Sequence, residues 1–476
     1  MNFDYLKKFP KLRKLSGYCS DAEQLVYTRP YLSGMSARQA LEYLVKLVYA
    51  SKIAPVDGLT MFDMLDDQRF INWIHDSYLL NSIHYVRKMG NAAVHQGDLT
   101  ESEALKVLEN LHFLVGEIML LFNIVDDYPE FVKPERKAKA PAPTPSIPAK
   151  PEKVQPEPEV VAEFAQRMRK TVFDTAHGRD ENENKKLFIA ASLRESGWKM
   201  VSVPNQAMPC CASLNCIIDD SGEMVDYILN GRDNRPLAVI EETETKKNPV
   251  LGRKKAIAAA EKLEQKYGYK PIVYYTDGYH IYCIDQLGFP ARRVFDFHTI
   301  EELELLKQRK TMRQDISNPV IDENITNRDY QKNAIRAVCN AFSENRRKSL
   351  IVMATGTGKT RVSISTVDVL MKANWVKNVL FLADRTSLVK QAHKNFNKLL
   401  PNVTTSVYSG GSMNRDENAR VIFSTYQTMI GLVNDEKKQF GIGRFDLIII
   451  DEAHRSIFKK YGALFHYFDA LMLGLT

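Results

Sequence analysis

Residues 349–360 read SLIVMATGTGKT, and this stretch predicts the fold of the C-terminal part of the chain. A short apolar run typical of a buried strand is followed by a Gly-rich turn and then by a helical pattern. The glycines let backbone N–H groups approach phosphate oxygens, the lysine reaches the β- and γ-phosphates, and the last threonine holds Mg²⁺. The residues expected to bind a nucleotide in this turn are Gly356, Thr357, Gly358, Lys359 and Thr360.

A second stretch, FDLIIIDEAHR (445–455), makes a chance Gly-rich turn a poor explanation. Its apolar strand brings Asp451 and Glu452 to the carboxyl end of the sheet, where ligands bind in α/β proteins. We expect Asp451 to hold Mg²⁺ and Glu452 to polarise the attacking water. The runs NVLFLA and RVIFST add further strands between helical segments, so the pattern predicts a doubly wound parallel sheet.

The bulk composition describes a globular chain of about three domains in 476 residues, with 44% hydrophobic and 26% charged residues. A net charge of +7 weakly favours a polyanionic partner. The six cysteines lack zinc-finger spacing, which favours reduced thiols and a cytoplasmic location. The sequence has neither a signal peptide nor an apolar run long enough to span a bilayer, so no membrane role is expected.

The chain divides into blocks of different pattern. Residues 1–131 predict a helical domain of uncertain role, in which SARQALEYLVKLVYA carries one apolar face and Thr100 with Glu103 forms a capping box. Residues 132–162 are rich in Pro, Lys and Glu and predict an extended linker. Residues 163–310 alternate short strands with helices, and residues 311–476 hold the parallel sheet.

MATGTGKT together with DEAH resembles the superfamily 2 helicases and translocases. In that family the first RecA-like lobe carries an adenine-reading segment, which RDYQ resembles, so Gln331 is the expected base contact. FLADRTSLVKQA and VIFSTYQTM are similar to its strand-gripping motifs, which makes Arg385 and Thr425 candidates for DNA contacts. The family continues into a second lobe with an arginine finger, so this chain alone is expected to bind ATP but to turn it over poorly.

Residues 236–256, PLAVIEETETKKNPVLGRKKA, resemble the acidic strand of PD-(D/E)xK nucleases. The resemblance implies that Asp226 and Glu241 converge from a hairpin to bind Mg²⁺, with Glu183 as a third carboxylate. The family's lysine is replaced by Thr243. Either the activity is lost, or Lys254 or Lys255 on the following helix supplies the missing ammonium.

Residues 164–476 as a whole resemble the motor (HsdR-type) subunit of type I restriction–modification enzymes, in which a nuclease precedes a DEAH motor. The resemblance implies a multidomain α/β protein with a helical head, a restriction-endonuclease-like domain and a RecA-like lobe. It implies that the protein translocates and cleaves double-stranded DNA, using ATP and Mg²⁺, together with methyltransferase and specificity subunits. The alternatives are a stand-alone defence or repair helicase whose nuclease fold only clamps DNA, and an inactive binding module that senses nucleotide.

Overall fold

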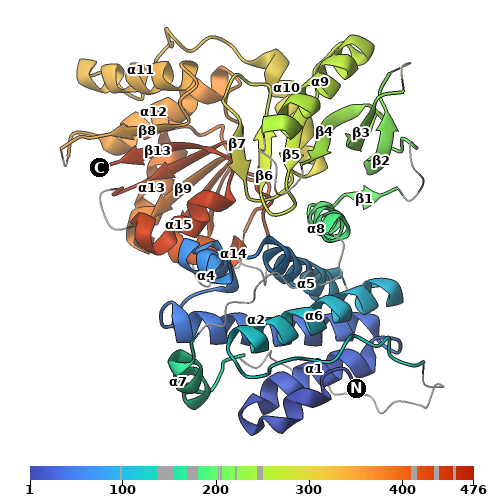
Figure 1. The fold of residues 1–476 in the computed structure, drawn as a ribbon. Helices are drawn as coiled ribbons and strands as arrows, with labels where there is room; N and C mark the ends of the chain where they lie inside the picture. Colours follow the sequence, from blue (N-terminus) through green and yellow to red (C-terminus); the bar gives the residue numbers. More distant parts are fainter. Residues whose placement is uncertain are drawn as a thin grey trace. The chain divides into compact units, whose positions relative to one another are not determined.

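This computed structural model describes residues 1–96, 99–136, 154–168, 181–201, 203, 206–219, 222–243, 250–354, 356–408, 415–433, 439–453 and 457–476. The chain forms two compact units, Met1–Glu195 and Ser196–Thr476. The described strands all belong to the second unit (Figure 1).

The first unit is helical, as its sequence predicts. Its 3₁₀ turns and helices are η1 (Asp4–Lys8), η2 (Pro10–Leu12), α1 (Arg13–Leu25), α2 (Pro30–Lys52), α3 (Met61–Asp66), α4 (Gln68–Ile74), α5 (Ser77–Gln96), α6 (Glu101–Leu121), α7 (Pro158–Gln166) and α8 (Glu181–Glu195). The predicted apolar face of α2 is buried, including Leu41, Leu44 and Val48. No described helix is long and apolar enough to cross a membrane.

Helix α6 begins with the predicted capping box. The Thr100 hydroxyl accepts from the Glu103 backbone N–H at 3.2 Å, and the Glu103 carboxylate accepts from the Thr100 N–H at 2.9 Å. Two of the N–H groups that a helix start leaves without partners are therefore satisfied. The helix behind this cap is almost wholly buried, which explains its long apolar run.

Thr100→Ala is expected to lower the free energy of unfolding of the helical unit by about 1 kcal/mol, because one cap hydrogen bond is lost. Urea unfolding followed by far-ultraviolet circular dichroism measures the change. Thr28→Ala is the matched control, since Thr28 is exposed and lies in a turn rather than at a cap. Equal midpoints for both variants would contradict the role of the cap.

The second unit contains a seven-stranded mixed sheet in which neighbours in sequence are neighbours in space. Its strands are β1 (Lys199–Met200), β2 (Cys211–Ile217), β3 (Met224–Asn230), β4 (Pro236–Glu242), β5 (Ile272–Thr276), β6 (Ile281–Ile284) and β7 (Arg292–Val294). The predicted β3–β4 hairpin is present, whereas β4 and β5 are parallel and joined by α9 (Val250–Tyr267). Helix α9 lies beside this sheet in Figure 1. Its small side chains Ala256, Ala259 and Ala260 pack in the same core as residues of the sheet, which allows a close approach.

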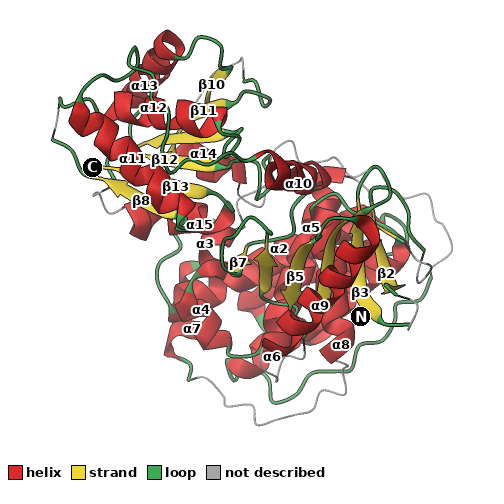
Figure 2. Cartoon of the chain, turned by 90° about the horizontal axis from the view of Figure 1, so that it is seen from above, coloured by secondary structure: helices red, strands yellow, loops and turns green. Residues whose placement is uncertain are grey.

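A six-stranded parallel sheet forms the rest of the second unit, in the order β10-β11-β9-β12-β13-β8. Its strands are β8 (Lys348–Ile351), β9 (Val379–Ala383), β10 (Thr405–Tyr408), β11 (Val421–Thr425), β12 (Leu447–Ile450) and β13 (Leu471–Leu475). The accompanying helices, drawn in red around the yellow strands in Figure 2, are α10 (Ile300–Met312), α11 (Asp329–Ser343), α12 (Lys359–Lys372), α13 (Thr386–Leu399), α14 (Tyr426–Val433) and α15 (Ile457–Tyr467). Strands β9, β12 and β13 are buried along their whole length, which is typical of parallel strands covered on both faces.

Buried charges connect the two sheets within this unit. Asp469, just before β13, accepts from Arg292 of β7 at 2.6 and 2.5 Å and from Arg347 at 2.7 Å. These two guanidinium groups hold the pKa of the Asp469 carboxyl well below its usual range, against the opposing effect of burial. A bidentate buried pair of this kind fixes the geometry of the groups that it joins.

Candidate functional site

The two carboxylates that the sequence places on the β3–β4 hairpin come together. The register pairs Tyr227 with Ile240, so Asp226 lies opposite Glu241. The Asp226 carboxylate accepts from the backbone N–H of Glu242 at 2.8 Å, which fixes it against the end of β4. The side chain of Glu241 is completely buried.

Of the two helix lysines, Lys255 reaches the carboxylates. Its ammonium donates to Glu241 Oε2 at 2.6 Å, while its own side chain remains 53% exposed. Lys254 is also exposed and has no hydrogen bond or ion pair among the residues that the structure describes. A cation that is anchored on a buried carboxylate and open to solvent can also contact an incoming phosphate.

A close contact between strand and helix explains how Lys255 reaches this position. Thr243 continues the end of β4, where its N–H donates to the Thr276 carbonyl at 2.7 Å, and its side chain is buried. Its methyl group lies against Gly252 so closely that a Cβ at Gly252 would be 1.9 Å from it. Glycine therefore lets the start of α9 sit on the strand end, and one turn later Lys255 lies over Glu241.

The electrostatics of the pair favour a bound cation. Burial and, to a smaller extent, the nearby Asp226 carboxylate together raise the pKa of Glu241 to about 8, although Lys255 opposes the rise. Oε1 of Glu241 is buried and has no hydrogen-bond partner among the described residues. Two adjacent carboxylates with an unsatisfied oxygen fit Mg²⁺, which commonly binds one or two carboxylates and completes its shell with water or phosphate oxygens. The described residues contain no group of three or more metal-ligating side chains.

Glu183, the predicted third carboxylate, lies on α8 of the first unit. It forms an ion pair with Lys106 of α6 at 2.7 Å and is more than half exposed. The role of Glu183 as a third catalytic carboxylate stays a prediction.

Two glycines of the Gly-rich turn have left-handed backbone conformations. Gly356 and Gly358 have φ angles of +80° and +96°, and Gly358 is the N-cap of α12. Lys359 and Thr360 therefore occupy the first turn of that helix, where N–H groups and the helix dipole attract phosphate. The Lys359 ammonium lies 3.9 Å from Glu452 Oε1.

Asp451 and Glu452 follow β12 at the same edge of the sheet. Burial raises the pKa of Asp451, and the neighbouring Glu452 carboxylate adds to the rise. Glu452 has a φ of +56°, a left-handed conformation that is uncommon outside glycine. The structure thus brings Lys359, Asp451 and Glu452 to one place.

Gln331, the expected base contact, lies on α11 beside the Gly-rich turn. Its amide donates to the Thr357 carbonyl at 2.8 Å and accepts from the Thr326 hydroxyl, and its side chain is buried. The neighbouring Tyr330 hydroxyl donates to the same carbonyl at 2.9 Å. Sequence reasoning missed Tyr330, although it stands next to Gln331 in RDYQ.

Arg385 and Thr425 lie on the other half of the same edge, after β9 and β11. Arg385 is exposed at the N-cap of α13, and the Thr425 hydroxyl accepts from the Thr428 N–H at 3.2 Å at the start of α14. Ala383 pairs with Thr425 across the two strands, so both candidates lie at neighbouring strand ends. Their expected contacts with DNA stay predictions.

Comparisons with known proteins find relatives of parts of this chain. Residues 324–476 match the family described as type III restriction enzyme, res subunit. The EcoKI type I endonuclease subunit of Escherichia coli (strain K12) is 28% identical over 208 residues, covering 38% of this chain and 18% of that protein. The EcoAI type I endonuclease subunit of Escherichia coli is 37% identical over 155 residues, covering 31% of this chain and 19% of that protein. About a third of this chain is thus similar in sequence to type I restriction endonuclease subunits.

It spans about a fifth of the length of these curated relatives. A solved fragment, assigned as an HsdR subunit of a type I restriction enzyme from Vibrio vulnificus YJ016, is 24% identical with a TM-score of 0.26. That match covers 63% of this chain and 55% of the fragment.

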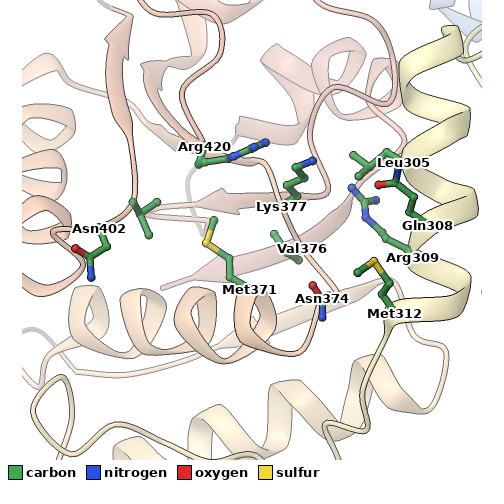
Figure 3. Close-up of a pocket in the computed structure, with 11 residues that line it drawn as sticks. Leu305, Gln308, Arg309, Met312, Met371, Asn374, Val376, Lys377, Asn402 and Arg420 are labelled. Carbon is green, nitrogen blue, oxygen red and sulfur yellow. The ribbon is translucent and has the colours of Figure 1, made fainter.

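A separate cavity of about 390 Å³ lies at the opposite edge of the six-stranded sheet (Figure 3). Val376, Asn402 and Arg420 line it just before β9, β10 and β11 begin, and α10 and the end of α12 contribute its other walls. Because nucleotides bind at the carboxyl ends of parallel strands, this cavity is distinct from the Gly-rich turn.

Proposed function

We propose that this chain works in an ATP-dependent, DNA-translocating restriction subunit that cleaves foreign double-stranded DNA within a type I restriction–modification complex. The observation that carries the proposal is the Lys255–Glu241 pair beside Asp226, in the same unit as a Gly-rich turn flanked by Asp451 and Glu452. Homology to type I restriction endonuclease subunits supports the same assignment. The methyltransferase and specificity subunits are the proposed partners, and they would select the DNA site.

The carboxylate site would carry out cleavage. Asp226 and Glu241 would hold Mg²⁺, which when bound stabilises the charge that develops on the phosphate. Lys255 would orient the attacking water or the scissile phosphate, because its ammonium is fixed on Glu241 at 2.6 Å and still faces solvent. The Thr243 side chain is uncharged, and its methyl group packs against Gly252.

The Gly-rich turn would carry out nucleotide binding. Lys359 would contact the β- and γ-phosphates from the first turn of α12, and Thr360 and Asp451 would hold the accompanying Mg²⁺. Glu452 would accept a proton from the attacking water. Arg385 and Thr425 would contact the DNA backbone at the ends of β9 and β11, beside rather than within the nucleotide site.

The natural protein that carries this chain, mixed with its methyltransferase and specificity subunits, is expected to linearise an unmethylated plasmid only when ATP and Mg²⁺ are present. Gel electrophoresis of the plasmid measures the reaction, and the fully methylated plasmid is the matched control. Cleavage that is independent of ATP would contradict the coupling of the two sites.

A helicase whose nuclease fold only clamps DNA is the second candidate, favoured by the threonine that replaces the usual lysine at position 243. It predicts ATP-dependent motion along DNA without any cleavage in the same assay. Retention of the plasmid in a gel shift together with an uncut product would support this candidate.

A further inference from the structure

The carboxylates belong to a longer row of side chains that crosses the seven-stranded sheet. The strand register pairs Glu241 with Tyr275, Tyr275 with Tyr282, and Tyr282 with Arg293, on β4 through β7. Directly paired residues on neighbouring strands point to the same face of a sheet. The row therefore lies on the face that carries α9, since Tyr275 and Tyr282 both pack with the α9 core.

The two tyrosines form an ordered aromatic pair. Their ring centroids are 5.0 Å apart and their planes differ by 5°. Tyr275 is buried next to Glu241, whereas Tyr282, one strand further out, is only half-buried. Among the described residues neither hydroxyl has a hydrogen-bond partner, and neither is one of the buried polar atoms without a partner, so both hydroxyls reach solvent.

Cations flank this aromatic pair. Arg293 is exposed, has no ion-pair partner among the described residues, and lies 5.7 Å from the ring centroid of Tyr279. Burial raises the pKa of Tyr275, and the Arg253 guanidinium on α9 opposes that rise, so a second cation lies near this ring. The row thus runs from carboxylates to stacked rings to guanidinium groups.

We propose that this row binds an unpaired DNA strand next to the cleavage site. A nucleobase stacks on the outer ring of the Tyr275–Tyr282 pair, and Arg293 and Arg253 contact the phosphates on either side. The strand then leads towards Glu241, two strand spacings or about 10 Å from Tyr282, and towards Asp226 on the next strand. This inference rests on the proposed nuclease function, and it specifies an unpaired strand as the form of DNA that the carboxylate site accepts.

Aromatic rings flanked by cations favour a single strand over a duplex. Stacking on a side chain needs a free π-face, which bases inside a duplex share with their neighbours. Each base stacked on an aromatic side chain contributes about 1–3 kcal/mol, irrespective of its sequence. A site of this kind would act on a strand that has been separated from its complement.

Photocrosslinking tests the proposal without requiring cleavage. The full chain is mixed with a single-stranded oligonucleotide containing 5-iodouracil, with Ca²⁺ in place of Mg²⁺, and crosslinked peptides are identified by mass spectrometry. We expect crosslinks in the β5 and β6 peptides. Tyr282→Leu should reduce their yield at subsaturating DNA about tenfold, whereas Tyr282→Phe, which keeps the ring, should leave it within twofold of the parent. Equal thermal unfolding of the two variants confirms that the packing against α9 survives.

Three results would overturn the inference. They are crosslinks confined to residues 311–476, an unchanged yield in Tyr282→Leu, or equal crosslinking of a blunt duplex of the same sequence. The outcome is separable from the proposed function, because cleavage is measured independently. A protein that cuts plasmid but shows any of these three results keeps its nuclease assignment and loses the single-strand site.

Discussion

Lys255→Ala is expected to reduce DNA cleavage by the natural protein and its partner subunits by about a hundred- to a thousandfold. A single well-placed electrostatic contact to the developing charge contributes roughly 3–4 kcal/mol to the transition state. Lys255 is the described lysine that reaches the carboxylates, through its 2.6 Å contact with Glu241. Rates of plasmid linearisation, measured under single-turnover conditions, give the effect.

Lys254→Ala is the matched control for this prediction, because Lys254 is the adjacent exposed lysine and contacts neither carboxylate. It should cut within about twofold of the parent. Binding of Mn²⁺, followed by isothermal titration, should survive in Lys255→Ala but not in Asp226→Ala with Glu241→Ala. Parent-like cleavage by Lys255→Ala would show that Lys255 does not supply the ammonium.

The contact between Thr243 and Gly252 also predicts what happens when the lysine of the nuclease family is restored at position 243. A lysine at position 243 would have to displace α9, because the threonine methyl group already touches Gly252. We therefore expect Thr243→Lys to lower the stability of the unit rather than raise cleavage. This expectation follows from the packing of Thr243 against Gly252, which the spacing of residues along β4 does not reveal.

The parts of the two sites that lie at strand ends could be predicted from the sequence. Asp226, Glu241 and Asp451 each belong to or follow a strongly apolar strand, and strand ends have few possible positions in a sheet. The choice between Lys254 and Lys255 could not be predicted. It depends on the rotation of α9 about its axis, which is set by a tertiary contact at Gly252.

The strands β2, β10 and β13 could not be predicted from the sequence for a different reason. Strand β2 falls in a segment whose clustered cysteines and polar residues were interpreted as buried thiols, and all six cysteines are indeed free. Strand β10 is a short edge strand of the parallel sheet, and β13 closes that sheet between β12 and β8. Single short strands gain most of their stability from pairing, which a local pattern does not reveal.

Lys359→Ala is expected to abolish measurable ATP binding by this chain. The residue occupies the first position of α12, directly after Gly358, and has Glu452 as its nearest acidic partner at 3.9 Å. Removing it takes away the cation that faces the phosphates and leaves Asp451 and Glu452 without compensation. Without this ammonium, the negative charge of the acidic pair would disfavour a polyanionic ligand at the start of α12.

Fluorescence titration with a labelled, non-hydrolysable ATP analogue and Mg²⁺ measures this loss. Lys348→Ala is the matched control, because Lys348 is exposed at the opposite, amino-terminal end of β8 and should bind the analogue like the parent. Retained affinity in Lys359→Ala would mean that the phosphates lie elsewhere. The assignments of Thr360, Asp451 and Glu452 would then fall together, since all three depend on a phosphate chain at the start of α12.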